Sequence, residues 1–207
     1  MHQTRQETTK KLPIKRKGTK YVVRALSNPQ NSVPVLIAMR DMLNLVKTNK
    51  EVKSLIHHKM LKINNRIVRD FRESISLFNL FEAGKTYILK LSPTRKFFFE
   101  ETKDTKERLC KVIGKRISKK GIFQLNLHDG TNLLSNNDKI KIGDSLYLSL
   151  DGKIKKHVPL EKGSEVFIVS GRYEGQHGKV ADVSGKTITI RFKEGSSILN
   201  IGGMIAL

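Results

Sequence analysis

Apolar and polar residues alternate over many short stretches of this chain, which is the pattern of half-buried β-strands. The clearest stretches span residues 123–127, 146–150, 165–168 and 187–192. Glycine, Asp-Gly or charged residues follow them, as turns between strands require. Apolar residues at helical spacing occur mainly between residues 32 and 60. The pattern therefore predicts an α+β fold that is mostly β.

The helical region predicts two short helices. Ser32 is placed to cap the first helix, and Pro34 would stand in its first turn. The apolar face of this helix comprises Val35, Leu36, Met39, Met42 and Leu43. Thr48 and Glu51 have the spacing of a capping box, which predicts the start of the second helix. The apolar side of that helix comprises Val52, Leu55 and Ile56.

Asn64 and Asn65 separate two strand-like runs, residues 60–63 and 66–68. Asparagine tolerates the left-handed backbone of a tight turn, so the runs predict a β-hairpin. Two helices followed by a small hairpin resemble the alpha-L RNA-binding motif, although many proteins with this motif carry glycine at the position of Asn65. The predicted module covers residues 32–86. The resemblance implies that helix ends and surface cations face phosphate groups.

Residues 87–160 are the predicted central β domain, which we expect to form a small barrel. Hairpin turns at Asp129-Gly130 and Asp151-Gly152 separate its strands. The run Phe97-Phe98-Phe99 would suit base stacking, but consecutive aromatic residues in a strand are better explained by core and edge packing. We assign no chemistry to the loop-rich segment of mixed charge between residues 94 and 120.

The segment from residue 161 to residue 182 carries the most specific motif in the chain. It reads as a strand, a basic loop marked by Gly171, Gly175 and Gly178, and a second strand. Glycine permits positive backbone dihedrals and lets a phosphodiester chain approach closely. The segment resembles a KOW motif, the core of an SH3-like barrel found in ribosomal and transcription proteins. It predicts a barrel over residues 161–207, in which the apolar end of the chain closes the sheet.

The chain is strongly basic, with 40 Lys and Arg against 19 Asp and Glu, a net charge of +21 and a pI near 10.2. Such a charge favours a polyanionic partner whose phosphates relieve the self-repulsion. A membrane surface is the alternative, but the sequence shows neither an amphipathic basic helix nor a lipidation signal, and no apolar run reaches about 18 residues. Cys110 is the only cysteine, which excludes an internal disulfide and a cysteine-based zinc cluster and indicates a cytosolic protein.

Residues 1–31 predict a basic tail that is extended and becomes ordered on its partner. Its candidate RNA-binding residues are Arg5, Lys10, Lys11, Lys15, Arg16, Lys17, Lys20 and Arg24, against Glu7 as the only acid among the first 24 residues. The candidates in the alpha-L module are Arg40, Lys47, Lys50, Lys53, Lys62, Arg66 and Arg69. Those in the KOW loop are Arg172, His177 and Lys179.

No arrangement of residues indicates catalysis, a cofactor or a metal site. The chain lacks a Gly-x-Ser-x-Gly elbow, and the KOW loop lacks the Gly-Lys-Ser/Thr ending of a phosphate-binding P-loop. The six histidines are scattered without the spacing of a zinc site. An RNA-modifying enzyme such as a pseudouridine synthase also uses an alpha-L module, but it needs a large catalytic domain. Small barrels occupy the chain after Leu80, so we predict a protein that is not an enzyme and takes no small-molecule substrate.

The order of basic tail, alpha-L module, central β domain and KOW barrel resembles the archaeal and eukaryotic type of the fourth protein of the small ribosomal subunit. Four short segments carry the most specific resemblance to this family. They are Pro-Ile-Lys-Arg-Lys-Gly-Thr-Lys-Tyr-Val-Val-Arg at residues 13–24, Pro-Val-Leu-Ile-Ala-Met-Arg-Asp at 34–41, Leu-Cys-Lys-Val-Ile-Gly at 109–114 and Gln-Leu-Asn-Leu-His-Asp-Gly at 124–130. One departure is that the family tail usually carries tryptophans where this chain has Leu12 and Tyr21.

The resemblance implies a cytoplasmic, structural constituent of the small ribosomal subunit that supports translation. Its partners would be small-subunit ribosomal RNA and neighbouring ribosomal proteins. Contact would run through phosphates and shape, because side chains cannot enter the narrow major groove of an RNA helix. The alternative is a free transcription or RNA-chaperone factor of the KOW type.

Overall fold

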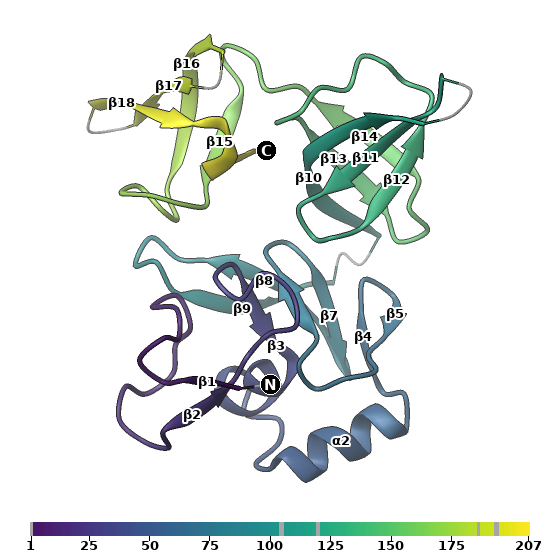
Figure 1. The fold of residues 1–207 in the computed structure, drawn as a ribbon, viewed down its shortest axis with the longest axis vertical. Coiled ribbons are helices and arrows are strands. Elements are labelled where there is room, and N and C mark those ends of the chain that lie inside the picture. Colours follow the sequence, from purple (N-terminus) through teal and green to yellow (C-terminus); the bar gives the residue numbers. More distant parts are fainter. Residues whose placement is uncertain (1, 104–105, 119–120, 186, 193–194) are drawn as a thin grey trace. The chain divides into compact units, whose positions relative to one another are not determined.

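The structure is a computed structural model that describes residues 2–103, 106–118, 121–185, 187–192 and 195–207 (Figure 1). Met1 of the tail and parts of the mixed-charge segment between residues 94 and 120 lie outside this description. The chain divides into two compact units, which are Met1–Thr105 and Lys106–Leu207. Strands predominate in both, which confirms the predicted α+β fold. No described helix combines the length and the apolar composition that crossing a bilayer requires.

The N-terminal unit is built on a five-stranded antiparallel sheet with the strand order β5-β4-β7-β8-β9. The strands span Leu61–Ile63 (β4), Arg66–Ile67 (β5), Leu80–Ala83 (β7), Lys85–Leu91 (β8) and Phe97–Glu101 (β9). Phe81, Leu89 and Phe97 are almost fully buried, whereas Phe98 is 39% exposed. The aromatic run is thus divided between core and edge, as its position in a strand predicted.

β8 and β9 belong to the N-terminal unit, whereas the sequence analysis assigned residues from 87 onward to the central domain. β7 and β8 pair in register through Leu80↔Ile88 and Phe81↔Tyr87. A single residue, Gly84, connects these strands at φ +78°. No linker is present in the sequence at this point, so the alternation pattern alone does not show which strand β8 joins.

Both predicted helices are present. The first begins as α1 (Val35–Ile37) and widens into a π-helical turn, η1 (Ala38–Met42). The second is α2 (Asn49–His57), and its N-terminus has the predicted capping box. The amide of Glu51 donates to the hydroxyl of Thr48, and that hydroxyl donates to the Glu51 carboxylate at 2.8 Å. The first of these bonds satisfies an amide donor that the first turn of a helix otherwise leaves unpaired, and the second orients the hydroxyl that accepts it.

Ser32 does not cap the first helix, which corrects the sequence prediction. It lies in a short strand, β3 (Ser32–Pro34), that pairs with β6 (Ser74–Ser76). Its buried hydroxyl donates to the carbonyl oxygens of Ser27 at 2.9 Å and Asn28 at 2.8 Å. The preceding turn therefore supplies the acceptors for this hydroxyl, and Pro34 occupies the cap position without a side-chain bond.

Asn64 and Asn65 form the predicted two-residue turn between β4 and β5. Their φ angles are +50° and +66°, the left-handed values that a type I′ turn requires. Asn64 also anchors the turn to β7. Its side-chain oxygen accepts from the amide of Leu80 at 2.9 Å, and its own amide donates to the Leu80 carbonyl at 2.9 Å. Glycine would permit the turn but could not make the side-chain bond.

The basic N-terminal segment is folded rather than extended. β1 (His2–Thr4) pairs antiparallel with β2 (Tyr21–Val23), so the residues between them form a closed basic loop. Leu12 is only 3% exposed, and the carbonyl of Lys11 accepts from the amide of Phe97 at 2.9 Å. The sequence suggested an extended tail because its few apolar residues follow no periodicity. One well-buried leucine and a short ladder hold the segment in place instead.

The first sheet of the C-terminal unit has the strand order β12-β11-β10-β13-β14. Its strands span Glu107–Ile117 (β10), Phe123–Leu127 (β11), Asn132–Ser135 (β12), Ser145–Ser149 (β13) and Ile154–Val158 (β14). β10 serves both halves of the sheet, because residues 107–111 pair with β13 and residues 112–117 pair with β11. A register shift between Val112 and Gly114 marks the change of partner. Such an irregularity bends a strand and lets a sheet curl on itself.

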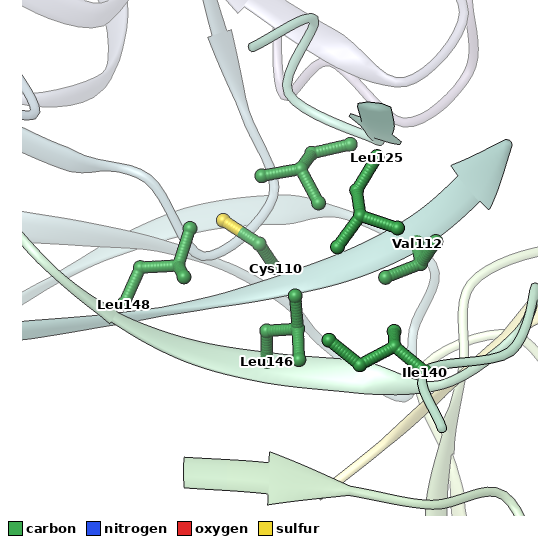
Figure 2. Close-up of a cluster of buried hydrophobic side chains, with 7 residues drawn as sticks. Cys110, Val112, Leu125, Ile140, Leu146 and Leu148 are labelled. Carbon is green, nitrogen blue, oxygen red and sulfur yellow. The ribbon is translucent and has the colours of Figure 1, made fainter. Parts of the chain in front are cut away.

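The core of this central barrel is small and wholly apolar. Figure 2 shows how its side chains converge between the strands, and the labelled residues are Cys110, Val112, Leu125, Ile140, Leu146 and Leu148. Each of them is at most 1% exposed. Burial raises the pKa of the Cys110 thiol, so this cysteine is an inert core residue.

The second sheet of the unit has the strand order β18-β17-β16-β15-β19. Its strands span Glu165–Ile168 (β15), His177–Ser184 (β16), Thr187–Phe192 (β17), Gly195–Asn200 (β18) and Met204–Ala206 (β19). The apolar end of the chain joins the sheet beside β15 through Val166↔Ala206, and β18 and β19 stand at the two ends of the strand order. β18 was not predicted, because its sequence is polar at most positions.

The two sheets of the C-terminal unit are joined by buried contacts. The ammonium of Lys111, on β10, donates to the carbonyl oxygens of Ile201 and Met204 in the last barrel. Gly143 packs so closely on Ile201 that an added Cβ would lie 2.9 Å from its methyl group. The buried carboxylate of Asp144 accepts from the amide of Leu160 at 3.1 Å. These contacts tie the KOW-like sheet to the central barrel.

Candidate nucleic-acid interface

Arg5 organises the basic loop between β1 and β2. Its guanidinium donates to the Thr19 carbonyl at 2.8 Å, to the Thr19 hydroxyl at 3.0 Å and to the carbonyl of Lys15. Gly18 lies beneath the guanidinium at φ +142°, and a Cβ there would meet it at 3.1 Å. Arg5 was predicted to contact RNA, but the structure commits this side chain to the fold of the loop.

The loop that Arg5 holds displays the other cations of the tail. Lys10, Lys15, Arg16, Lys17 and Lys20 on the loop, and Arg24 just after β2, are all exposed. Lys11 is half-buried, and its ammonium donates to the Asn31 side-chain oxygen at 2.6 Å. Lys96, which the sequence analysis did not select, lies beside them and donates to the Lys10 carbonyl. The structure therefore concentrates exposed positive charge on one folded loop.

Three predicted cations of the alpha-L module are paired with carboxylates. Arg40 contacts Asp41 at 2.9 Å, Lys62 contacts Glu82 at 3.4 Å, and Arg66 contacts Glu73 at 2.7 Å. Glu73 is 8% exposed and also accepts from the amide of Arg69 at 2.7 Å, so it fixes the segment after β5. Exposed ion pairs contribute little to stability, but they lower the charge that these side chains offer to phosphate.

Helix α2 presents an exposed basic side. Lys50, Lys53 and His57 are separated by three and four residues, so they lie on one side of the helix, away from the buried Val52. The Lys53 ammonium lies 5.4 Å from the centre of the Phe71 ring. Lys47, just before the helix, and Arg69, just after β5, are also exposed. The predicted cations on this side of the helix are balanced by fewer carboxylates than the other predicted cations of the module.

The loop that the sequence analysis interpreted as a KOW loop has the predicted glycine geometry in part. Gly171 and Gly175 have φ of +99° and +81°, where a side chain is strained. Gly178 has no positive φ and lies in β16 rather than in a turn, which corrects the sequence interpretation. A Cβ at Gly178 would lie 2.4 Å from the Ile190 methyl carbon, so close packing requires glycine there.

The three predicted KOW cations lie in the turn before β16 and in β16 itself. Arg172 lies over the Tyr173 ring at 5.9 Å. His177 and Lys179 share one face of β16 because they are two residues apart, and the His177 ring contacts Phe167 edge-on at 5.1 Å. Lys179 pairs directly with Arg191 on β17, and both are exposed. Arg191 was missed, although its alternate position in the strand Thr187–Phe192 indicates that it faces outward.

The central barrel also exposes cations that the sequence analysis left without a role. They are Arg116, Lys139, Lys141, Lys153, Lys155 and Lys156, and only Lys155 forms an ion pair within the described chain, with Glu107. By contrast, Arg108 and Asp129 form a buried pair. Burial alone would raise the pKa of Asp129, but the Arg108 guanidinium and the bonds from Thr131 hold it below its ordinary value. That pair supports the fold and is not available to a ligand.

Within the described residues, no three His, Cys, Asp or Glu side chains are grouped so that they could hold a metal ion. The site is instead a set of exposed cations on a folded loop, a helix and two small barrels. These features define a class of basic, multi-module β-proteins whose surfaces suit a polyanion.

Comparisons with known proteins identify the family within this class. The model of Ribosomal family S4e matches residues 83–154. The small ribosomal subunit protein eS4 of Archaeoglobus fulgidus is 30% identical over 186 residues, which cover 87% of this chain and 79% of that protein. The protein of the same name from Desulfurococcus amylolyticus is 32% identical over 188 residues, covering 83% and 75%. This chain therefore belongs to the S4e family of ribosomal proteins, as its motifs predicted.

A solved structure shows the same fold. The crystal structure of the 30S ribosomal protein S4e from Thermoplasma acidophilum superposes with a TM-score of 0.74 at 23% sequence identity. The match covers 86% of this chain and 95% of that one. Because the family consists of structural ribosomal proteins, the chain is not an enzyme, which confirms the prediction.

Proposed function

We propose that this chain is a structural constituent of the small ribosomal subunit that binds and stabilises small-subunit ribosomal RNA and thereby supports translation in the cytoplasm. The observation that carries the proposal is the distribution of exposed cations over every folded part of a chain with a net charge of +21. Relatives named small ribosomal subunit protein eS4 support the same assignment. Neighbouring proteins of the subunit would be its other partners.

The proposed mechanism is electrostatic clamping. The basic loop between β1 and β2, the exposed side of α2 and the outer face of β16 and β17 would each neutralise a different stretch of RNA backbone. Such contacts release condensed counterions, so affinity should fall steeply as salt is raised. They carry little base readout, because an RNA helix offers side chains no access to its major groove.

Two measurements test the proposal. The tagged chain should sediment with small subunits in sucrose gradients, and it should stay there when the salt is high enough to remove loosely bound factors. The purified chain should bind folded small-subunit RNA with a steep salt dependence in a filter assay. A chain found only in the free fractions would favour the alternative, a free KOW-type transcription or RNA-chaperone factor. Absence of salt-dependent RNA binding would contradict both.

A further inference from the structure

A basic hollow of about 490 Å3 opens beside the folded tail. Its walls come from two parts of the N-terminal unit that are distant in sequence, the loop between β1 and β2 and the end of the π-helical turn η1. The residues that matter chemically are Lys15, Lys17, Tyr21, Arg40, Asp41 and Asn44. The volume lies within the range of about 300–1,000 Å3 that small ligands occupy.

One wall offers a flat aromatic surface. Tyr21 lies on β2, where it pairs with Thr4, and it remains 51% exposed. The His2 ring contacts it edge-on, with ring centres 4.4 Å apart, and the Lys20 ammonium lies 5.4 Å from the ring centre. An exposed tyrosine held by a strand, with the Lys20 ammonium beside its ring, is a platform on which a nucleic-acid base can stack.

The charges of the hollow divide into those already used and those still available. Arg5 is committed to the loop through Thr19 and Lys15, and Arg40 is paired with Asp41 at 2.9 Å. Lys15 and Lys17 are exposed, and their ammonium groups make no hydrogen bond or ion pair within the described part of the chain. These two ammonium groups are therefore the anion-binding groups of the hollow.

The remaining wall carries groups suited to a base edge. Asn44 is exposed at φ +53°, and its side-chain amide supplies both donors and an acceptor. Because Asp41 is neutralised by Arg40, the acid does not repel an anionic ligand from this wall. Within one hollow, Tyr21 can stack on the base of a nucleotide and the side-chain amide of Asn44 can bond to the edge of that base. The unpaired ammonium groups of Lys15 and Lys17 can bind its phosphate.

We infer that this hollow binds one unpaired nucleotide of an RNA strand, with its base on Tyr21, its edge at Asn44 and its phosphates at Lys15 and Lys17. The inference deepens the proposed function and rests on it. A bulged or single-stranded nucleotide is required, because a base within a helix cannot present its face to a side chain. The tail would therefore recognise an irregularity in the RNA, whereas the other cations follow the backbone.

The test uses the full chain and a single-stranded RNA decamer that contains one 2-aminopurine. Binding should quench the 2-aminopurine fluorescence through stacking. Tyr21→Leu should weaken binding by about tenfold or more, because the loss of one base–aromatic stack has that size. Tyr21→Phe should retain most of the affinity and the quenching. Phe98→Leu, which removes another exposed aromatic side chain of the same unit, is the matched control and should bind like the wild type.

Further arms separate the possible outcomes. Lys15→Gln with Lys17→Gln should reduce the salt slope of decamer binding by about 1.4 units, at about 0.7 for each phosphate contact. Equal loss from Tyr21→Leu on the decamer and on a fully paired duplex would overturn the inference, as would no loss beyond that of Phe98→Leu. Saturation by free AMP at the decamer's affinity would also overturn it, because the ligand would then be a mononucleotide. If the wild type binds folded ribosomal RNA while Tyr21→Leu behaves normally, the hollow is refuted and the proposed function stands. If the wild type binds no RNA, the proposed function fails with it.

Discussion

The ammonium group of Lys111 donates a hydrogen bond to the carbonyl oxygen of Met204 at 2.7 Å, and so connects the central barrel to the last strand of the chain. A second bond from the same ammonium reaches the carbonyl of Ile201. Lys111 is 4% exposed, so the bonds form in a place from which water is largely excluded. A lysine that binds no phosphate thus organises the unit that displays other cations.

Lys111→Met should destabilise the C-terminal unit. The methionine fills similar space but leaves two carbonyl oxygens without the donor they have in the wild type, at a cost of about 1–3 kcal/mol. Urea unfolding followed by circular dichroism at about pH 10 measures the change, because the Lys111 amine of the folded chain is uncharged there and the cost of burying a charge no longer masks the lost bonds. Lys153→Met, which removes an exposed lysine of the same unit that forms no ion pair within the described chain, is the control and should change stability by less than about 0.5 kcal/mol. Equal effects of the two substitutions would show that the buried bonds contribute nothing.

The same substitution should change the pH dependence of stability. Burial lowers the pKa of Lys111 to about 8, whereas the unfolded value is about 10.4. The unfolded state therefore binds more protons between these values, so the contribution of Lys111 to stability rises as the pH increases from about 8 to about 10.4. The difference in unfolding free energy between wild type and Lys111→Met should grow in that window by about 1.4 kcal/mol per pH unit. A difference that stays constant from about pH 7 to about pH 10 would refute the shift.

Two substitutions in the KOW region should separate folding from binding. Gly178→Val places carbon atoms where Ile190 already lies, so it should destabilise the barrel by about 1–3 kcal/mol and lower its melting temperature. Arg172→Glu lies in an exposed loop, so it should weaken RNA binding and leave the melting temperature nearly unchanged. Thermal melts and filter binding on the same preparations give both numbers. Unchanged affinity for Arg172→Glu would mean that this loop faces solvent or protein.

The exposed side of α2 should contribute to RNA binding in proportion to its charge. Lys50→Gln with Lys53→Gln should lower the salt slope by about 1.4 units, at about 0.7 per lost phosphate contact. The control is Lys85→Gln with Lys90→Gln, because those lysines already pair with Glu101 at 2.9 Å and Glu100 at 2.7 Å. Plots of log affinity against log salt compare the two variants. Parallel lines for α2 and wild type would remove this helix from the interface.

The N-terminal segment should behave as part of the folded unit. Leu12→Ala removes a side chain that is 3% exposed, so we expect a loss of about 2 kcal/mol or more and faster proteolysis of the tail. Deleting residues 1–24 should likewise lower the melting temperature. Replacing the six exposed basic residues of that segment by glutamine, with Arg5 and Lys11 left in place, should reduce the salt slope by at most about 4 units. A deletion that melts like the full chain would restore the view of an independent, disordered tail.

What the sequence predicts well here depends on neighbours along the chain. The turn at Asn64 and Asn65 and the capping box of Thr48 and Glu51 are satisfied within a few residues, so their chemistry is visible in the sequence. The assignment of β8 to the N-terminal sheet depends on pairing with a particular strand, and alternation does not specify a partner. The folded tail depends similarly on the burial of Leu12 and on the bond between Lys11 and Phe97, which are far apart in sequence.

In the candidate site, too, the sequence predicts local features well and misses those that depend on the tertiary fold. Sequence composition correctly indicates which segments carry exposed positive charge, including the side of α2. It does not reveal that Arg5 is bound to Thr19, or that Arg66 is paired with Glu73. Those bonds join residues that the tertiary fold brings together. Lists of basic residues therefore overestimate the number of cations that remain available to a phosphate.

The close packing of Gly143 on Ile201 has a consequence for the thermodynamics of assembly. Two barrels on a flexible linker would each lose their own translational and rotational freedom when they bound one RNA. Barrels joined by this contact lose that freedom once, and the second barrel then meets its site at a high effective concentration. A residue larger than glycine at this position would weaken the joint, so it should slow capture of the second RNA segment even if each barrel kept its own affinity.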